Sequence, residues 1–316
     1  MILTKNDVQK ITFGALYTTE TDGKFDFFRF TPEQVAVYEK EAPRFAPRTE
    51  SSTCVQFDFH TDAESFSFSY STESRIGPRI NYAFIDVWVD GMMVAHEGGY
   101  HNTKREGRLE TTLPKGEKHI TVYFPCFFRT TVWDVFLPDG ARVRPAEKKY
   151  KVLMLGDSIT HGAESHFPSL TSANTVIREL GFDAVCQAIG GEVFRPSILG
   201  ENRLFDPDII TVALGANDWN GVPDGKRYFE KLSALYPNSR IIYVSPIWSK
   251  GLDGHCLEAI DGYEAAAREY GAEVIHGLDT IPHLPEMFTD GEHPSTLGFT
   301  LYSKALLKAF RALGVN

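Results

Sequence analysis

Ser158 follows a glycine at the end of a predicted strand, a position from which a hydroxyl can act as a nucleophile. The apolar run 152–155 (VLML) predicts a buried strand, and Gly156-Asp157-Ser158 comes directly after it. Gly156 permits a sharp turn, so the Ser158 hydroxyl would face a cleft together with backbone N–H groups of the following turn. A turn serine or an N-cap serine is the alternative interpretation. The chain contains no Gly-x-Ser-x-Gly elbow of the α/β-hydrolase kind.

Near the C-terminus, Asp290 precedes His293 by three residues. A serine nucleophile needs a base, and the base needs a carboxylate at its other ring nitrogen. One tight turn, eased by Gly291, would bring Asp290 to His293. Pro294 and the helix-start residues Ser295-Thr296 place the histidine on a loop that enters the last predicted helix. Surface Asp and His also occur at this spacing without any such role.

Two further segments follow predicted strands. Gly190-Gly191 ends a candidate strand over 183–188, and adjacent glycines there can expose a backbone N–H. Asn217 follows the apolar run 209–214, and its side-chain NH₂ could donate to a developing oxyanion. A glycine pair is more often a simple turn, and Asn-Asp after a strand is more often a helix cap.

Taken in order along the chain, these blocks resemble the SGNH (GDSL-type) hydrolase superfamily. Gly156-Asp157-Ser158 matches its first block, Gly215-x-Asn217-Asp218 its third and Asp290-x-x-His293 its last. The second block departs from the usual Asn-x-Gly-x-Ser-Gly, since this chain has Gln187-Ala188-Ile189-Gly190-Gly191. Gly191 fits its glycine best, and Gly190 remains open.

The resemblance covers about residues 150–313 and implies a serine esterase that needs no cofactor and no metal. Ser158, Asp290 and His293 would be its catalytic residues. The oxyanion hole would consist of the backbone N–H groups of Ser158 and Gly191 and the side chain of Asn217. Asp157 and Asp218 are expected to stabilise their loops by accepting backbone N–H bonds. His161 and His166 have no carboxylate partner in the sequence and are interpreted as bystanders.

The elements that must position these residues differ between the two halves of the chain. From about 50 to 137, residues alternate between apolar and polar in runs such as 55–60, 65–70, 84–89, 119–124 and 131–136. This half predicts an antiparallel β-sandwich or jelly roll. The second half alternates apolar strands (also 241–244) with helices at about 167–181, 224–236, 256–270 and 296–313. It predicts a doubly wound α/β domain with its site beyond the carboxyl ends of the strands. The domain boundary is placed between residues 148 and 149, giving domains 1–148 and 149–316.

The composition of this 316-residue chain limits the classes of molecule that it is expected to bind. Its formal net charge of −10, without any cluster of Lys and Arg, argues against nucleic acid. There is no apolar run near twenty residues and no signal-peptide pattern at the start, so we expect no membrane span and a cytoplasmic location. Four scattered cysteines without a Cys-x-x-Cys pair are expected to be reduced and partly buried. A homo-oligomer is left open.

A sandwich joined to an SGNH domain resembles two-domain bacterial carbohydrate esterases, so the resemblance implies a small-molecule or oligosaccharide ester as substrate. Trp219 and Trp248 follow strand ends and could offer aromatic faces to a sugar, although core or rim tryptophans are as common. The sequence therefore predicts an esterase that removes acetyl groups from O-acetylated carbohydrate. A short-chain lipase or thioesterase and a catalytically silent carbohydrate-binding protein are the alternatives.

Overall fold

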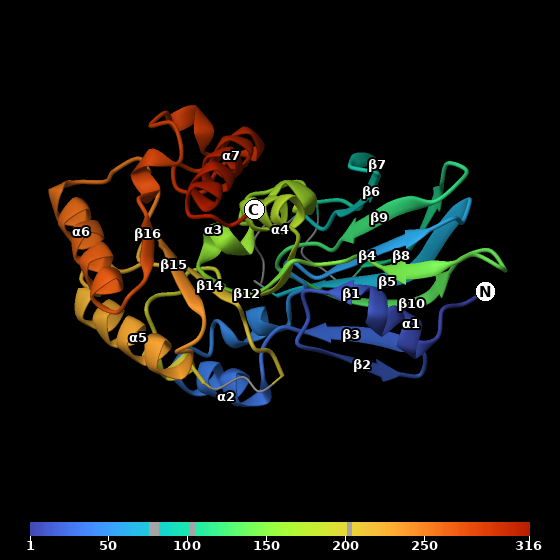
Figure 1. Ribbon diagram of the computed structural model, residues 1–316, viewed down its shortest axis with the longest axis horizontal. Coiled ribbons are helices and arrows are strands. Elements are labelled where there is room, and N and C mark those ends of the chain that lie inside the picture. Colours follow the sequence, from blue (N-terminus) through green and yellow to red (C-terminus); the bar gives the residue numbers. More distant parts are fainter. Residues whose placement is uncertain (76–81, 101–104, 201–203) are drawn as a thin grey trace.

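The computed structural model describes residues 1–75, 82–100, 105–200 and 204–316. An antiparallel β-sandwich occupies the first part of the chain and a parallel sheet with helices the second (Figure 1). One sheet of the sandwich has the order β1 (Thr12–Phe13), β4 (Gln56–Thr61), β9 (Lys118–Tyr123), β6 (Ile85–Val89), β7 (Met92–Glu97), with β11 (Val143–Pro145) paired to β4. The other has the order β2 (Tyr17–Thr21), β3 (Lys24–Phe28), β10 (Phe128–Phe136), β5 (Ser65–Ser74), β8 (Arg105–Thr112). The predicted antiparallel sandwich is confirmed.

Aromatic side chains at alternate positions form the core between these two sheets. Phe57 of β4 meets Phe68 of β5 and Phe124 edge to face, with ring centroids 6.0 and 5.1 Å apart. All three side chains are fully buried. Asp90 and Gly91 both adopt positive φ between β6 and β7, as a two-residue hairpin turn requires.

The first 50 residues also form helices, for which the sequence analysis made no prediction. α1 (Lys5–Ile11) and α2 (Pro32–Glu41) each begin with a capping box, formed by Thr4 with Asp7 and by Thr31 with Gln34. A short 3₁₀ helix, η1 (Ala46–Glu50), follows α2. α1 packs on strands β11 and β4 of the sandwich, whereas Tyr38 of α2 packs into the apolar cluster of the parallel sheet.

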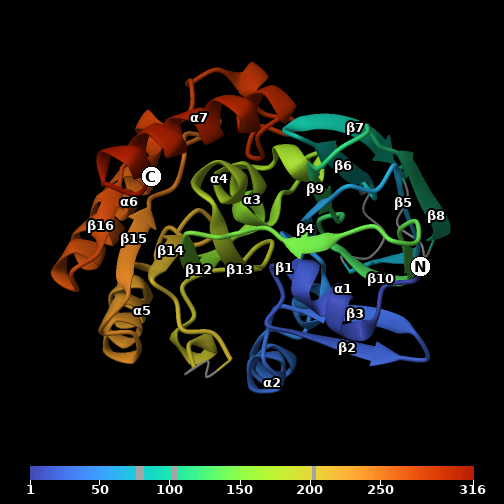
Figure 2. The ribbon, with the colours of Figure 1, turned by 45° about the vertical axis from the view of Figure 1, so that its right-hand side comes forward.

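The parallel sheet has the order β13 (Phe182–Ala188), β12 (Tyr150–Gly156), β14 (Ile209–Ala213), β15 (Arg240–Val244), β16 (Glu273–Ile275). α4 (Ser172–Leu180) and α7 (Thr296–Ala312) cover one face, and α5 (Val222–Leu235) and α6 (Gly254–Glu269) cover the other (Figure 2). The remaining helices are α3 (Ser158–His161), η2 (Pro168–Leu170), η3 (Pro196–Ile198), η4 (Gly277–Asp279) and η5 (Pro285–Met287). The predicted doubly wound domain is confirmed.

The apolar spacing of the helices explains this packing. On α4, Ala173, Val176, Ile177 and Leu180 recur every three or four residues, and all four side chains are buried against the sheet. The other face of the sheet has an additional contributor from the N-terminal part of the chain. Phe30, Tyr38 and Phe45, in and around α2, join the cluster that contains the buried side chains of β12, β14, α5 and α6. The predicted division at 148/149 falls between β11 and β12.

Candidate active site

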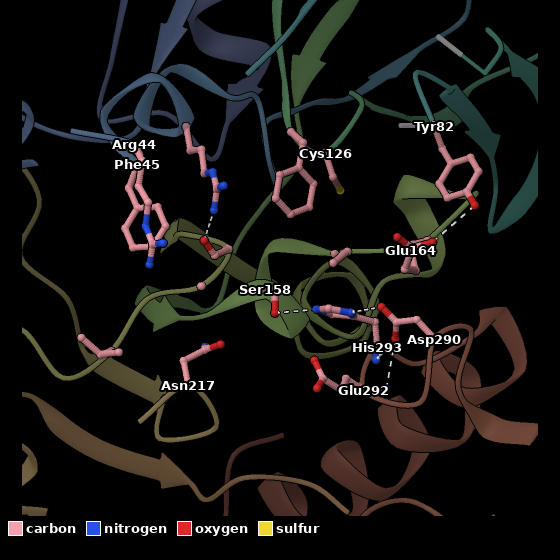
Figure 3. Close-up of a pocket in the computed structure, with 18 residues that line it drawn as sticks. Arg44, Phe45, Tyr82, Cys126, Ser158, Glu164, Asn217, Asp290, Glu292 and His293 are labelled. Carbon is pink, nitrogen blue, oxygen red and sulfur yellow. Dashed lines mark hydrogen bonds and ion pairs between the residues drawn. The ribbon is translucent and has the colours of Figure 1, made fainter. Parts of the chain in front are cut away.

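Ser158, Gly191 and Asn217 follow three neighbouring parallel strands and meet at the carboxyl edge of the sheet. Ser158 is the first residue of α3 after β12, Gly191 follows β13, and Asn217 follows β14. The three residues line one cavity of about 420 Å³, together with Asp290 and His293 (Figure 3). The sheet topology gathers Ser158, Gly191 and Asn217, because parallel strands end at one edge, and the segment before α7 brings Asp290 and His293 to the same cavity.

Ser158, His293 and Asp290 form a continuous hydrogen-bonded chain. The Ser158 Oγ lies 2.8 Å from the His293 Nε2, and the His293 Nδ1 lies 2.7 Å from the Asp290 Oδ2 (Figure 3). With its Nδ1–H donated to the carboxylate, the imidazole turns an unprotonated Nε2 toward the serine hydroxyl. This geometry lets the imidazole accept the serine proton.

The Asp290 carboxylate is fixed by its own turn. Its Oδ1 accepts the backbone N–H groups of Glu292 at 3.0 Å and His293 at 2.8 Å. Burial by itself would raise the pKa of Asp290, but the hydrogen bonds and the neighbouring His293 outweigh it and lower the pKa. The carboxylate therefore stays ionised beside the imidazole.

The two adjacent glycines after β13 differ in what their N–H groups do. The Gly190 N–H donates to the His161 Nδ1 at 3.0 Å. The Gly191 N–H has no acceptor within the described part of the chain, and Gly191 has a φ of +84°. A positive φ of this size favours glycine, and a Cβ at this position would lie 3.1 Å from the Phe45 ring.

One of the two side-chain N–H groups of Asn217 is used in a hydrogen bond within the protein. Its Nδ2 donates to the Glu192 carbonyl oxygen at 3.0 Å. A primary amide carries a second N–H on the same nitrogen, and the Asn217 side chain borders the cavity. The contact with Glu192 thus ties the loop after β14 to the loop after β13.

His161 is not a bystander, contrary to the sequence interpretation. Its ring is fully buried, lies 3.7 Å from the Phe127 ring, and has its Nε2 2.9 Å from the Ser51 Oγ. Burial, and then the charges of Arg29 and Arg48, lower the pKa of His161 well below its ordinary value. The neutral His161 ring, at the end of α3, accepts the Gly190 N–H and so positions the loop after β13. No sequence pattern pointed to this role, because Ser51 and Phe127 are distant in the chain.

Two arginines of the N-terminal part hold β13 and the loop that follows it. Arg29 is fully buried and donates to the carbonyl oxygen of Cys186 at the end of β13, and to the Ser51 backbone oxygen at 2.6 Å. Arg48 donates through Nη1 to the Gly190 carbonyl oxygen. The sequence analysis missed both, since they act through backbone groups about 140 to 160 positions away.

Asp157 and Asp218 accept backbone N–H bonds, as expected. Asp157 accepts from Ile159 and Asp218 from Asn220, both at 3.0 Å. Asp157 is buried, and burial raises its pKa to about 6. Each carboxylate caps the turn that carries its neighbouring site residue.

The two tryptophans lie apart from the main cavity. Trp219 borders a smaller cavity of about 130 Å³ that also touches Ser158 and His293. Trp248 stacks on His283 at 5.4 Å and packs against Phe288. Their substrate contacts stay predictions.

Among the described residues, no group of His, Cys, Asp and Glu could hold a metal ion. The four cysteines are free and buried. No helix in the described ranges combines the length and the apolarity that crossing a membrane requires.

Residues 154–301 match the sequence profile of the GDSL-like Lipase/Acylhydrolase family. This part of the chain is a GDSL-like hydrolase domain. The match spans all four blocks, from Ser158 to His293, so the enzyme is an ester hydrolase of the SGNH type. No curated protein matches this chain.

Solved structures share the fold of this chain over most of its length. A salicylyl-acyltransferase, SsfX3, from a tetracycline biosynthetic pathway has a TM-score of 0.75 at 19% identity, covering 96% of this chain and 94% of that one. A putative GDSL-like lipase from Bacteroides ovatus has a TM-score of 0.73 at 16% identity, covering 98% and 97%. A family two carbohydrate esterase from Clostridium thermocellum, in complex with cellohexaose, has a TM-score of 0.58 at 17% identity, covering 83% and 93%. At these identities the likeness concerns the fold, including the sandwich in front of the hydrolase domain.

Proposed function

We propose that the protein hydrolyses short acyl esters, with Ser158 as nucleophile, His293 as base and Asp290 as its orienting carboxylate. The observation that carries the proposal is the 2.8 Å contact between the Ser158 Oγ and the His293 Nε2, at the wall of an open cavity. The contact between His293 and Asp290, at 2.7 Å, completes the arrangement.

In the first half of the reaction, His293 takes the hydroxyl proton as the Ser158 Oγ attacks the ester carbonyl carbon. The ion pair with Asp290 stabilises the resulting imidazolium. The tetrahedral intermediate collapses, His293 gives the proton to the leaving alcohol oxygen, and the acyl group remains on Ser158. Water, deprotonated by His293, then attacks the acyl carbon, and the acid leaves as Ser158 regains its proton.

The oxyanion would be held by the N–H groups of Ser158 and Gly191 and the second N–H of Asn217. Gly191 is preferred over Gly190, because the Gly190 N–H is already donated to His161. Ser158 is the first residue of α3, where backbone N–H groups have no partner within the helix. The three donors come from three separate loops of one cavity.

For the substrate, we propose an O-acetylated carbohydrate. Two observations support it: the likeness to family two carbohydrate esterases extends over sandwich and hydrolase domain together, and polar side chains line much of the cavity. A short-chain lipase or thioesterase is the alternative within the same chemistry. A silent binding protein is disfavoured, because the serine, histidine and aspartate are in hydrogen-bond contact.

Acyl transfer is a second candidate, favoured by the fold likeness to a salicylyl-acyltransferase. The acyl-enzyme would be the same, and an acceptor alcohol would replace water as the second nucleophile.

The test compares wild type with Ser158→Ala and with Ser239→Ala, a serine outside the cavity whose hydroxyl donates to the Pro207 carbonyl. We expect acetate release from p-nitrophenyl acetate and from acetylated xylan, mannan or simple sugar acetates by wild type and S239A only. Equal activity of S158A would refute the role of Ser158. In a second assay, glycerol is added to p-nitrophenyl acetate as an acceptor alcohol. Formation of acetylated glycerol instead of free acetate would favour acyl transfer.

A further inference from the structure

The cavity beside Ser158 has opposite charges on its two sides. Arg44 and Arg48, both from the N-terminal part of the chain, line one side, over the Gly190-Gly191 loop. Glu164 and Glu292 line the other, near His293 (Figure 3). A substrate in this cavity therefore meets cations at one end and carboxylates at the other.

Arg44 presents its charge to solvent at the cavity wall. Its side chain is exposed, and its guanidinium carbon lies 4.5 Å from the centre of the Phe45 ring. In the part of the chain that the structure describes, no carboxylate pairs with it. A guanidinium with this freedom can make two parallel hydrogen bonds to an incoming carboxylate.

Arg44 stands beside a buried aromatic ring and a second arginine. Phe45 is buried, and Arg48 lies over the same ring, with its guanidinium carbon 4.8 Å from the ring centre. Arg48 is anchored through Nη1 on the Gly190 carbonyl oxygen. The anchored Arg48 adds a second positive charge beside Arg44, in a chain whose net charge is −10.

We propose that Arg44, supported by Arg48, binds a carboxylate of the substrate, so that the enzyme prefers esters that carry a carboxylate. This inference rests on the proposed ester hydrolysis at Ser158. The carboxylate can belong to the alcohol, as in an acetylated uronic acid, or to the acyl group, as in a hemisuccinate ester. Both present the same anion to the arginine.

The acidic side of the cavity sharpens the preference. A carboxylate placed near Glu292 or Glu164 would be repelled, and one placed at Arg44 would be attracted. The anion therefore fixes which way the ester lies in the cavity, with its charged end toward Arg44. Orientation of this kind raises kcat/KM for the charged substrate over its neutral isostere.

Two pairs of esters test the proposal, and the members of each pair differ at the position of one carboxylate. The first pair is methyl O-acetyl-glucoside and the corresponding O-acetyl-glucuronate, and the second is p-nitrophenyl butyrate and p-nitrophenyl hemisuccinate. The variants are Arg44→Gln and, as a control, Arg311→Gln in the last turn of α7, outside the cavity. The readout is the ratio of kcat/KM for the charged member to that for the neutral member.

We expect wild type and R311Q to favour the charged member of one pair, and R44Q to lower that ratio about 3- to 10-fold, as for one exposed charge-assisted contact. The pair that responds identifies the source of the carboxylate. A ratio that is unchanged in R44Q, or a wild-type preference for the neutral member in both pairs, would overturn the proposal.

A binding measurement separates this proposal from the proposed function. Glucuronate, glucose, methyl hemisuccinate and methyl butyrate are titrated into the S158A variant with and without R44Q, by ligand-observed NMR. Binding of a carboxylate that R44Q weakens supports the arginine site even where wild type hydrolyses no ester. Equal binding of charged and neutral ligands contradicts the site even where hydrolysis is found.

Discussion

The Nδ1 of His161 accepts the backbone N–H of Gly190 at 3.0 Å, and this contact decides which of two adjacent glycines can face the substrate. Because Nδ1 is an acceptor, the ring proton resides on Nε2, which donates to the Ser51 Oγ at 2.9 Å. A residue of α3 thereby connects the loop after β13 to the N-terminal part of the chain. The Gly191 N–H is left to the cavity.

Replacing His161 by alanine should lower kcat about 10- to 100-fold and change KM less, since a displaced Gly191 weakens transition-state contacts more than substrate binding. The measurement is steady-state hydrolysis of p-nitrophenyl acetate. His166→Ala is the control: His166 is five residues further along the chain, outside the main cavity, and this variant should retain activity within about two-fold. A rise in KM with kcat unchanged would argue against a positioning role.

His161 should also make stability depend on pH. The unfolded chain protonates this histidine near its ordinary pKa of about 6.5, whereas burial holds the folded pKa well below that value. The unfolded state therefore binds more protons below pH 6.5, and stability falls by up to about 1.4 kcal/mol per pH unit on further acidification. Urea unfolding at pH 7.5 and 5.5 should show this loss in wild type and a smaller loss in His161→Gln. Equal losses in both would show that another group is responsible.

Replacing Gly191 by alanine should reduce kcat by about 100-fold or more. The φ of +84° strains an alanine, and its Cβ would press on Phe45 at 3.1 Å, so the backbone N–H must move. Gly23→Ala is the matched control: its φ of +74° is similarly strained, and no atom lies within 4 Å of the added Cβ. Both variants should lose some thermal stability, but only G191A should lose turnover. Similar kcat values for G191A and G23A would contradict the proposed role of Gly191 in the oxyanion hole.

Replacing Asn217 by alanine should lower kcat about 100-fold or more, the usual cost of one oxyanion donor, with KM nearly unchanged. Asn220→Ala, three residues further along the chain, lacks a place in the main cavity and serves as the control. A loss of less than about five-fold in N217A would assign the second N–H of Asn217 to something other than the oxyanion.

The sequence predicted those strands and site residues whose positions follow from a local pattern of neighbouring residues. The apolar runs 152–155 and 209–214 correctly predicted strands of the parallel sheet, because a strand covered on both faces must be apolar throughout. They also placed Ser158 and Asn217 at one edge of the sheet. β16, with only three residues at the sheet edge and mixed burial, was too short to stand out.

The contacts that connect the two halves could not be predicted. Arg29 is one of many arginines in the sequence, and only the fold reveals that it reaches the carbonyl oxygen of Cys186 from the interior. His161 has no carboxylate near it in the sequence, so no functional role was predicted for it. Its partners in the structure are the backbone N–H of Gly190 and the hydroxyl of Ser51. Contacts to backbone groups leave no pattern in a sequence, because every residue has a backbone.

α2 has a consequence for how the molecule unfolds. Tyr38 of this helix is buried in the same apolar cluster as Leu153 and Tyr243 of the parallel sheet, while the strands before and after the helix belong to the sandwich. A chain cut before Tyr150 would leave that cluster open to water and the buried Arg29 without its acceptors on β13. The intact protein should therefore melt in one calorimetric transition rather than two, with its halves behaving as a single cooperative unit.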